Sequence, residues 1–249
     1  MPLQKVIFDS IGTRTLREHI YKAIKNSILM NKLLPGQEVS IGELAVKLGV
    51  SETPVREALA MLKTEGLIDC EPRKKLQIAK ITEENVRQVY EVRKLLEPHA
   101  VSLVIASISK NPQLKENLRI VHEQARKIIS TAINAYRYED YIEIDMKLNE
   151  IFLQGAGNTL FGELLAFVGD RSMRIRTFVE ATCQVKPMNV IHTITEEHQT
   201  IIQAMLDGNI AEAQMGLHRH LLNGESRTLE EIFKYKKDSS TLDYAFNVS

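Results

Sequence analysis

The sequence has no tryptophan, few aromatic residues and only two cysteines, and each shortage excludes a class of protein. Aromatic side chains make up 6% of the 249 residues, which argues against a protein that stacks sugars or cages cations on aromatic faces. Cys70 and Cys183 are too few for a disulfide framework, and the paired-cysteine spacing of zinc ribbons is absent. No apolar run is long enough to span a bilayer, and the first residues lack the apolar stretch of a signal peptide. We therefore expect a cytoplasmic protein with reduced thiols.

Net charge is lacking as well, because 32 Lys and Arg residues balance 32 Asp and Glu residues. The charges are unevenly placed. Residues 1–80 carry 13 basic against 9 acidic side chains, and the remainder of the chain is acidic. This asymmetry indicates a chain that binds nucleic acid at one end and something else at the other.

Helical periodicity is present almost throughout. Within residues 1–80, apolar stripes predict three short helices, the third beginning with Thr53 as N-cap and Pro54 as first helical residue. Two strand-like runs follow, Leu67–Cys70 and Leu76–Ile81, and form a hairpin with a basic tip. After Thr82 we expect helices at about 83–108, 112–135, 138–155, 158–181, 187–207 and 209–235.

The predicted fold class is therefore mainly α. Residues 1–80 are expected to form a winged helix-turn-helix, with three helices plus a small β-hairpin wing. Residues 81–236 are expected to form an all-α antiparallel helical bundle, and residues 237–249 a flexible tail.

The third predicted helix carries side chains suited to DNA at its N-terminal end. Ser51, Thr53 and Arg56 lie where a recognition helix meets base edges, and an Arg can contact guanine through two hydrogen bonds. Arg73 and Lys74 of the hairpin tip, with Lys75, can reach phosphates or the minor groove. The alternatives are an intrahelical pair of Arg56 with Glu52 and a solvated basic turn.

The motifs around these residues resemble a known family. They are Leu33-Leu34-Pro35-Gly36, Glu43-Leu44-Ala45, Leu48-Gly49-Val50-Ser51-Glu52-Thr53-Pro54-Val55-Arg56-Glu57-Ala58-Leu59, Leu62 and Glu65-Gly66-Leu67. This pattern resembles the winged helix-turn-helix of the GntR family of transcriptional regulators over most of residues 15–78. The resemblance implies a DNA-binding domain. Glu52 departs from the family, which usually has a base-reading Arg at that position.

Three apolar helix faces in the second part of the chain each enclose polar side chains. Asp145 and Asn149 lie one turn apart on one face, and isoleucines surround His198 on another. The turn at 208–209 places His198 and His220 at about the same height on two antiparallel helices. Two imidazoles level with a carboxylate predict a metal site, and the alternative is a buried hydrogen-bonded cluster without metal.

The resemblance extends into this part. Tyr90-Glu91-Val92-Arg93, Leu96-Glu97, Gly157-Asn158, Glu197-His198 and His220-Leu221 are similar to the FCD effector-binding and dimerisation domain of FadR-type GntR regulators, over about 83–235. In metal-binding members, one Asp and three His hold an ion near a small carboxylate effector. Asp145, His198 and His220 match three of these ligands. Asn149 stands in place of the fourth, and its amide oxygen is a weaker ligand, but the two His still favour zinc or nickel.

Arginines are the candidates to bind an acidic effector. Arg93 lies on a core-facing stripe, where it either pairs with Glu97 one turn away or clamps a carboxylate. The resemblance favours the clamp. Arg174 and Arg171 lie on a helix that we expect to face the same pocket.

Together these features predict a transcriptional regulator, most simply a repressor, that binds double-stranded DNA as a homodimer at a palindromic operator. A small organic acid, bound through a divalent metal ion, is expected to control the affinity for DNA. The alternative is a regulator for which the ion itself is the signal. We do not expect an enzyme, because the sequence has neither an HExxH motif nor a nucleophile elbow.

Overall fold

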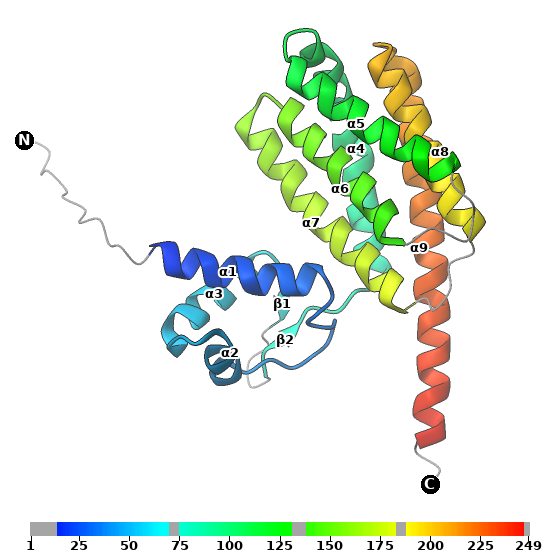
Figure 1. The fold of residues 1–249 in the computed structure, drawn as a ribbon. Helices are drawn as coiled ribbons and strands as arrows, with labels where there is room; N and C mark the ends of the chain where they lie inside the picture. The colour runs from blue at the N-terminus through cyan, green and yellow to red at the C-terminus, as the bar shows by residue number, and fades with distance from the viewer. Residues whose placement is uncertain (1–13, 70–74, 131–137, 183–187, 247–249) are drawn as a thin grey trace, which may run out of the picture. The chain divides into compact units, whose positions relative to one another are not determined.

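The computed structural model describes residues 14–69, 75–130, 138–182 and 188–246. The chain divides into two compact units, Met1–Lys80 and Ile81–Ser249, here the N-terminal and C-terminal domains (Figure 1). Each domain encloses its own buried apolar cluster. The described residues are mainly helical with one two-stranded sheet, which confirms the predicted fold class.

The N-terminal domain consists of three helices and a short hairpin. The helices are α1 (Arg14–Leu29), α2 (Ile41–Leu48) and α3 (Glu52–Thr64), and the strands are β1 (Ile68–Asp69) and β2 (Gln77–Ile78). The strands are antiparallel, with Ile68 opposite Ile78. They are shorter than the predicted runs, and an isolated bridge joins Gln77 of β2 to Glu38. Isoleucines of α1 and the apolar stripe of α3 fill the core.

Helix ends in this domain follow from capping chemistry, with one correction to the sequence prediction. The helix α2 begins after Ser40, whose hydroxyl accepts a hydrogen bond from the Glu43 backbone, and ends at Gly49 with a φ of 67°. The N-cap of α3 is Ser51 and not Thr53. The helix can begin earlier because Pro54, which lacks an N–H, is tolerated within the first turn.

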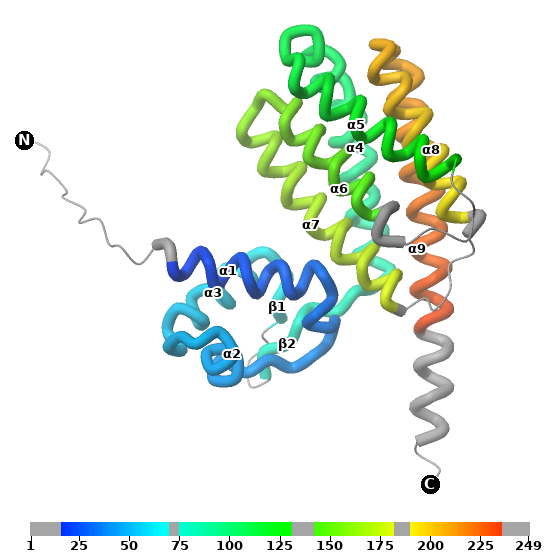
Figure 2. Tube along the Cα trace, viewed as in Figure 1, coloured from blue at the N-terminus to red at the C-terminus, as the bar shows by residue number. Residues whose placement is uncertain are grey.

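Six helices make up the described part of the C-terminal domain. They are α4 (Glu83–Ile108), α5 (Pro112–Ser130), α6 (Tyr138–Gly155), α7 (Thr159–Thr182), α8 (Met188–Leu206) and α9 (Ile210–Phe246). The helix α4 packs against α6, α7 and α9, while α8 packs against both α5 and α9. Figure 2 traces this bundle, in which the short turn at Gly208 returns α9 along α8. The antiparallel helical bundle predicted from the sequence is thus observed.

Two features of the long helices bear on the site. The helix α4 starts with a reciprocal capping box between Thr82 and Asn85, which fixes the start of the helix that carries Arg93. The helix α9 continues to Phe246, past the predicted boundary at residue 236. Residues 237–246 contain neither Gly nor Pro, so no residue type there interrupts helical hydrogen bonding.

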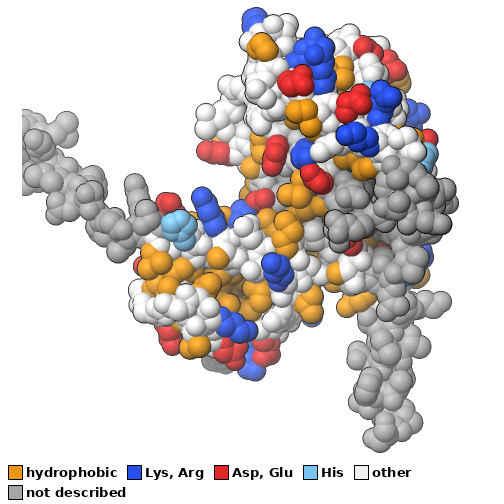
Figure 3. All heavy atoms as spheres, in the orientation of Figure 1, with side chains coloured by type: hydrophobic (Ala, Val, Ile, Leu, Met, Phe, Trp, Pro, Cys, Tyr) orange, Lys and Arg blue, Asp and Glu red, His pale blue; other side chains and the backbone are white. Residues whose placement is uncertain are grey.

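The surface carries charges of both signs. In the view of Figure 3, basic and acidic side chains are interspersed over the C-terminal domain. Among the described helices, none has both the length and the hydropathy needed to cross a bilayer.

Candidate functional site

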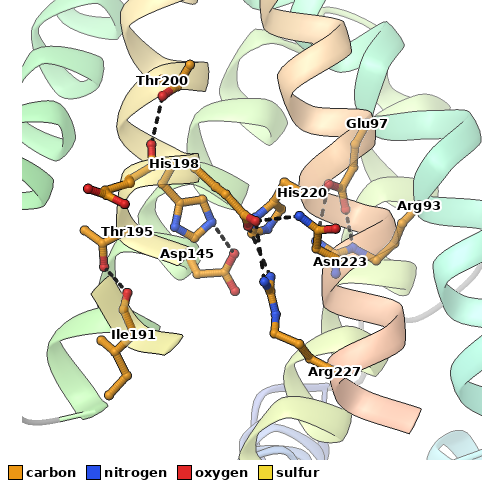
Figure 4. A network of polar contacts seen from close by, with 12 residues as sticks. Arg93, Glu97, Asp145, Ile191, Thr195, His198, Thr200, His220, Asn223 and Arg227 are labelled. Atoms are coloured by element: carbon orange, nitrogen blue, oxygen red, sulfur yellow. Dashed lines mark hydrogen bonds and ion pairs between the residues drawn. The ribbon is translucent and has the colours of Figure 1, made fainter. Parts of the chain in front are cut away.

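Three side chains from three helices converge inside the C-terminal domain. Asp145 of α6, His198 of α8 and His220 of α9 are all buried, and one ligand atom from each lies within 4.8 Å of the others. The two imidazole centroids are 4.5 Å apart, and Nε2 of His198 is 3.5 Å from Oδ1 of Asp145. Figure 4 shows these side chains pointing toward one another.

Glu197 sets the tautomer of His220. Burial alone would raise the pKa of Glu197, but hydrogen bonds from His220, Arg227 and Asn223 outweigh it and lower that pKa to about 2. An ionised carboxylate only accepts hydrogen bonds. Nδ1 of His220, 2.8 Å from Oε2 of Glu197, is therefore the donor, which leaves the Nε2 lone pair available to a metal.

Both imidazoles are neutral at physiological pH. Burial, followed by the positive charge of Arg176, lowers the pKa of His198 to about 3. Burial, followed by the neighbouring His198, lowers the pKa of His220 to about 3. Neutral imidazole is the form that binds metal ions.

Asn149 lies on α6 one turn from Asp145, at the wall of a small inner cavity. This inner cavity measures about 20 Å³ and is also lined by Asp145, His198 and His220, which is room for one water-sized body. Gly169 of α7 makes space for the amide, since a Cβ on that glycine would lie 2.7 Å from Nδ2 of Asn149. Asn149 is thus placed beside the three converging side chains.

Arg176 of α7 is the site residue that the sequence reasoning missed. It forms an ion pair with Asp145 and lines the inner cavity. Its signal was indirect: a carboxylate on an apolar face requires a counter-charge, and helix 158–181 offers several arginines. Periodicity alone does not select among them.

The other two arginines of α7 are placed elsewhere. Arg174 is buried, but it lines neither the inner cavity nor the larger outer cavity that is described below. The guanidinium of Arg171 lies 3.4 Å from the ring centroid of Phe167 and donates to the Phe167 carbonyl. The structure therefore does not bring the predicted effector residue Arg174 into the site.

Arg93 forms the predicted pair with Glu97 and also lines both cavities. Its Nε donates to Glu97 at 2.6 Å, and both side chains are buried. The guanidinium also lies 5.1 Å from the centroid of the Tyr90 ring, and Arg93 lines both cavities. The pair with Glu97 holds the fork in place at the cavity wall.

A larger outer cavity adjoins the inner one. It has a volume of about 220 Å³ and shares Arg93, Arg176 and His220 with the inner cavity. One part of its wall is apolar, and another is charged. The apolar part includes Val179, Val190 and Ile194, and the charged part includes Arg227, Glu230, Glu231 and Lys234. Its volume lies below the range usual for drug-sized ligands, so the outer cavity suits a small molecule.

The donor set fits a divalent metal of borderline softness. Two neutral imidazoles and one carboxylate are the ligands preferred by zinc and nickel. Glu197 supplies the carboxylate that orients a ligating His in such sites. Asn149 would add a neutral oxygen donor, and a metal ion here would act as a Lewis acid toward an acidic ligand.

The predicted DNA-binding residues lie at the start of α3. Ser51 caps the helix without a side-chain hydrogen bond, and Thr53 is exposed. The guanidinium of Arg56 lies 3.5 Å from Glu52, one turn away, with its side chain 67% exposed. Arg73 and Lys74 lie outside the described residues, and Lys75 beside them pairs with Glu38.

Two family models match the chain. The model of bacterial regulatory proteins of the gntR family matches residues 16–77, and the FCD domain matches residues 88–223. The HTH-type transcriptional regulator YdhC of Bacillus subtilis is 25% identical over 222 residues, which span 88% of this chain and 93% of that protein. The HTH-type transcriptional repressor RspR of Escherichia coli is 25% identical over 223 residues, which span 88% and 92%.

Solved structures share the fold. The Escherichia coli protein McbR/YncC superposes with a TM-score of 0.72 at 17% identity, over 87% of this chain and 98% of that one. The Zn²⁺-bound FCD domain of TM0439 superposes with a TM-score of 0.51 at 22% identity, over 63% of this chain and all of that domain. At these identities the likeness concerns the fold alone.

Proposed function

The chain belongs to the GntR family of bacterial regulatory proteins and carries an FCD domain, and from this premise we propose that a small organic acid, bound beside a divalent metal ion, controls its binding to operator DNA. Membership makes the chain a DNA-binding transcriptional regulator and not an enzyme. The observation that carries the proposal is the convergence of Asp145, His198 and His220 beside an arginine-lined cavity.

The DNA-binding mode we propose is that of a homodimeric repressor acting in the cytoplasm. Two copies of α3 would present Ser51, Thr53 and Arg56 to two half-sites of a palindromic operator, because two-fold protein symmetry then matches two-fold operator symmetry. The exposed fork of Arg56 supports a bidentate contact with guanine. Arg73 and Lys74 are proposed to contact the DNA backbone.

The effector site is proposed to use the residues of both cavities. Asp145, His198 and His220, with Asn149 as a weaker fourth ligand, would hold zinc or nickel. The fork of Arg93, held by Glu97, would orient the effector carboxylate. The acid must bind one arrangement of the protein more tightly than another in order to change its affinity for DNA.

A second candidate is a regulator for which the metal ion is the signal. It is supported by the small volume of the inner cavity, about 20 Å³, which accommodates an ion without an organic ligand. The two candidates differ in whether metal alone changes the affinity for the operator.

The test is an operator selection followed by titration. Random duplexes bound by the purified protein are enriched and sequenced, and binding to the selected duplex is measured by fluorescence anisotropy with chelator, with Zn²⁺, and with Zn²⁺ plus a panel of small carboxylic acids. We expect a palindrome bound by two chains, and weaker binding with Zn²⁺ plus one class of acid. Release by Zn²⁺ alone would favour the second candidate. Absence of any selected sequence would contradict both.

A further inference from the structure

Three arginines that line the two cavities each form an ion pair with a carboxylate. Arg93 pairs with Glu97, Arg176 with Asp145, and Arg227 with Glu197. The positive charges of these three arginines balance the three carboxylates with which they pair. An acid that enters this cluster alone therefore meets guanidinium groups that already have carboxylate partners, and its own charge has no counterpart.

Arg176 differs from the other two arginines in the partner that it holds. Glu97 and Glu197 are not among the three converging ligand side chains, whereas Asp145 is one of them. Arg176 also lines both cavities, and its side chain is only 13% exposed. Arg176 thus holds Asp145, the carboxylate that a metal ion would bind. Arg176 also faces the outer cavity, which suits an acid.

We propose that Arg176 exchanges its ion-pair partner, from Asp145 to the carboxylate of a bound acid, when a metal ion binds. A divalent cation that binds Asp145, His198 and His220 displaces the guanidinium from Asp145, and the guanidinium then pairs with the carboxylate of an acid in the outer cavity. No covalent bond changes, and the cation's two positive charges replace the one lost from Asp145. This inference deepens the proposed function and rests on it.

The exchange makes the two ligands cooperative. Without metal, an acid has to compete with Asp145 for Arg176. Without an acid, the metal has to displace Arg176 from its ion pair with Asp145 into a poorly solvated cavity. When both bind, each charge has a counterpart. By linkage, each ligand then raises the affinity for the other by the same factor.

The experiment is a Zn²⁺ titration by calorimetry of the full-length protein, with and without propionate, a monocarboxylate that binds zinc weakly. The variants are Arg176→Ala and Arg176→Gln, the second keeping a polar side chain in case the first does not fold. The matched control is Arg171→Ala, on the same helix but outside both cavities.

We expect propionate to tighten Zn²⁺ binding by the wild type about tenfold, within the usual range of coupling between sites. Both Arg176 variants should bind Zn²⁺ about tenfold more tightly than the wild type without propionate, because Asp145 has no competing partner. They should also lose the response to propionate, while Arg171→Ala keeps it. If the Arg176 variants bind Zn²⁺ and the wild type does not, the exchange is supported as well.

The exchange is overturned if the Arg176 variants bind Zn²⁺ no more tightly than the wild type, if they keep the propionate response, or if no form binds zinc. Operator binding is measured on the same preparations. If operator binding by the wild type still responds to an acid, the exchange alone has failed. If neither an acid nor a metal changes operator binding, the proposed function has failed as well.

Discussion

Arg56 lies in the second turn of α3 with its guanidinium in solvent, and its pair with Glu52 is exposed on both sides. Exposed ion pairs contribute little to stability, about 0–1 kcal/mol. We therefore expect Arg56→Ala to leave thermal unfolding nearly unchanged. Affinity for the selected operator should fall by about 1–3 kcal/mol, the value of a bidentate guanine contact, as measured by anisotropy.

The control for Arg56 is Lys63→Ala, which removes a positive charge from the other end of the same helix. It should weaken operator binding far less, and equally for operator and unrelated duplexes. Unchanged operator affinity in Arg56→Ala would remove this residue from the recognition surface.

Asn149 offers a second test at the residue scale. Its side chain lines the inner cavity beside Asp145, His198 and His220, but an amide oxygen is a weaker ligand than an imidazole for borderline metals. We expect Asn149→His to tighten Zn²⁺ binding on the order of tenfold, measured by competition with a zinc indicator. Asn149→Ala should weaken it. Equal affinities in all three proteins would mean that this side chain does not face the ion.

Single residues were predictable from the sequence where burial conflicts with polarity. Asp145, His198 and His220 stand out because each interrupts an apolar stripe, and the Gly208 turn sets the common height of the two histidines. Arg176 could not be chosen in this way, because its partner Asp145 comes from another helix and the pairing depends on how α6 and α7 pack.

Helix crossings in the C-terminal domain depend on close approach at glycines. Gly155 meets Val104 of α4, Gly224 meets the Tyr90 ring, and Gly169 meets Asn149, all at distances too short for an added Cβ to fit without movement. The crossing of α6 and α7 at Gly169 is the one that reaches the inner cavity. Its geometry therefore links helix packing to the position of a candidate ligand.

We expect Gly169→Ala to push the Asn149 amide away and to weaken Zn²⁺ binding. Overpacking of this kind costs about 1–3 kcal/mol, which denaturant unfolding of the metal-free protein would detect. The matched control is Gly162→Ala on the same helix, where an added Cβ meets its nearest neighbour at 3.9 Å and gains helix propensity of up to about 1 kcal/mol. If both variants bind Zn²⁺ like the wild type, contact with Gly169 does not position Asn149.

At the scale of elements, the sequence predicted the helices well because their apolar periodicity is long and their breaks contain Pro or Gly. It was less accurate at ends. The sequence predicts that α3 starts at Thr53-Pro54, whereas Ser51 is its N-cap in the structure. The polar composition of the last residues predicts that α9 ends near residue 235, but α9 continues to Phe246. Polar composition reports on exposure, and a helix can continue after burial ends.

At the scale of the whole molecule, the two domains were predictable because each has its own motif and its own apolar stripes. The N-terminal motif fixes a DNA-binding fold, and the C-terminal pattern fixes a helical bundle with polar side chains inside. The outer cavity could not be predicted, because it lies between α4, α7, α8 and α9 and its volume depends on their packing.

Buried ionisable groups also make the stability of the whole C-terminal domain depend on pH. The pKa values of His198 and His220 are lowered from 6.5 to about 3, and that of Glu197 from 4.5 to about 2. Below pH 6.5 the unfolded chain therefore binds more protons than the folded chain, and the free energy of unfolding decreases as the pH is lowered. The histidine contribution is lost between about pH 6.5 and 3, and the Glu197 contribution between about pH 4.5 and 2.

We therefore expect the metal-free protein to lose stability steadily between pH 7 and pH 5 in guanidinium unfolding followed by circular dichroism. A variant with His198→Gln and His220→Gln should show a much shallower slope over that interval, whatever its stability at pH 7, because glutamine does not titrate. A smaller slope of the same sign should remain in that variant, since burial also lowers the pKa of His122. An equally steep slope in both proteins would mean that the two imidazoles bind protons equally in the folded and unfolded states, and that burial does not lower their pKa values.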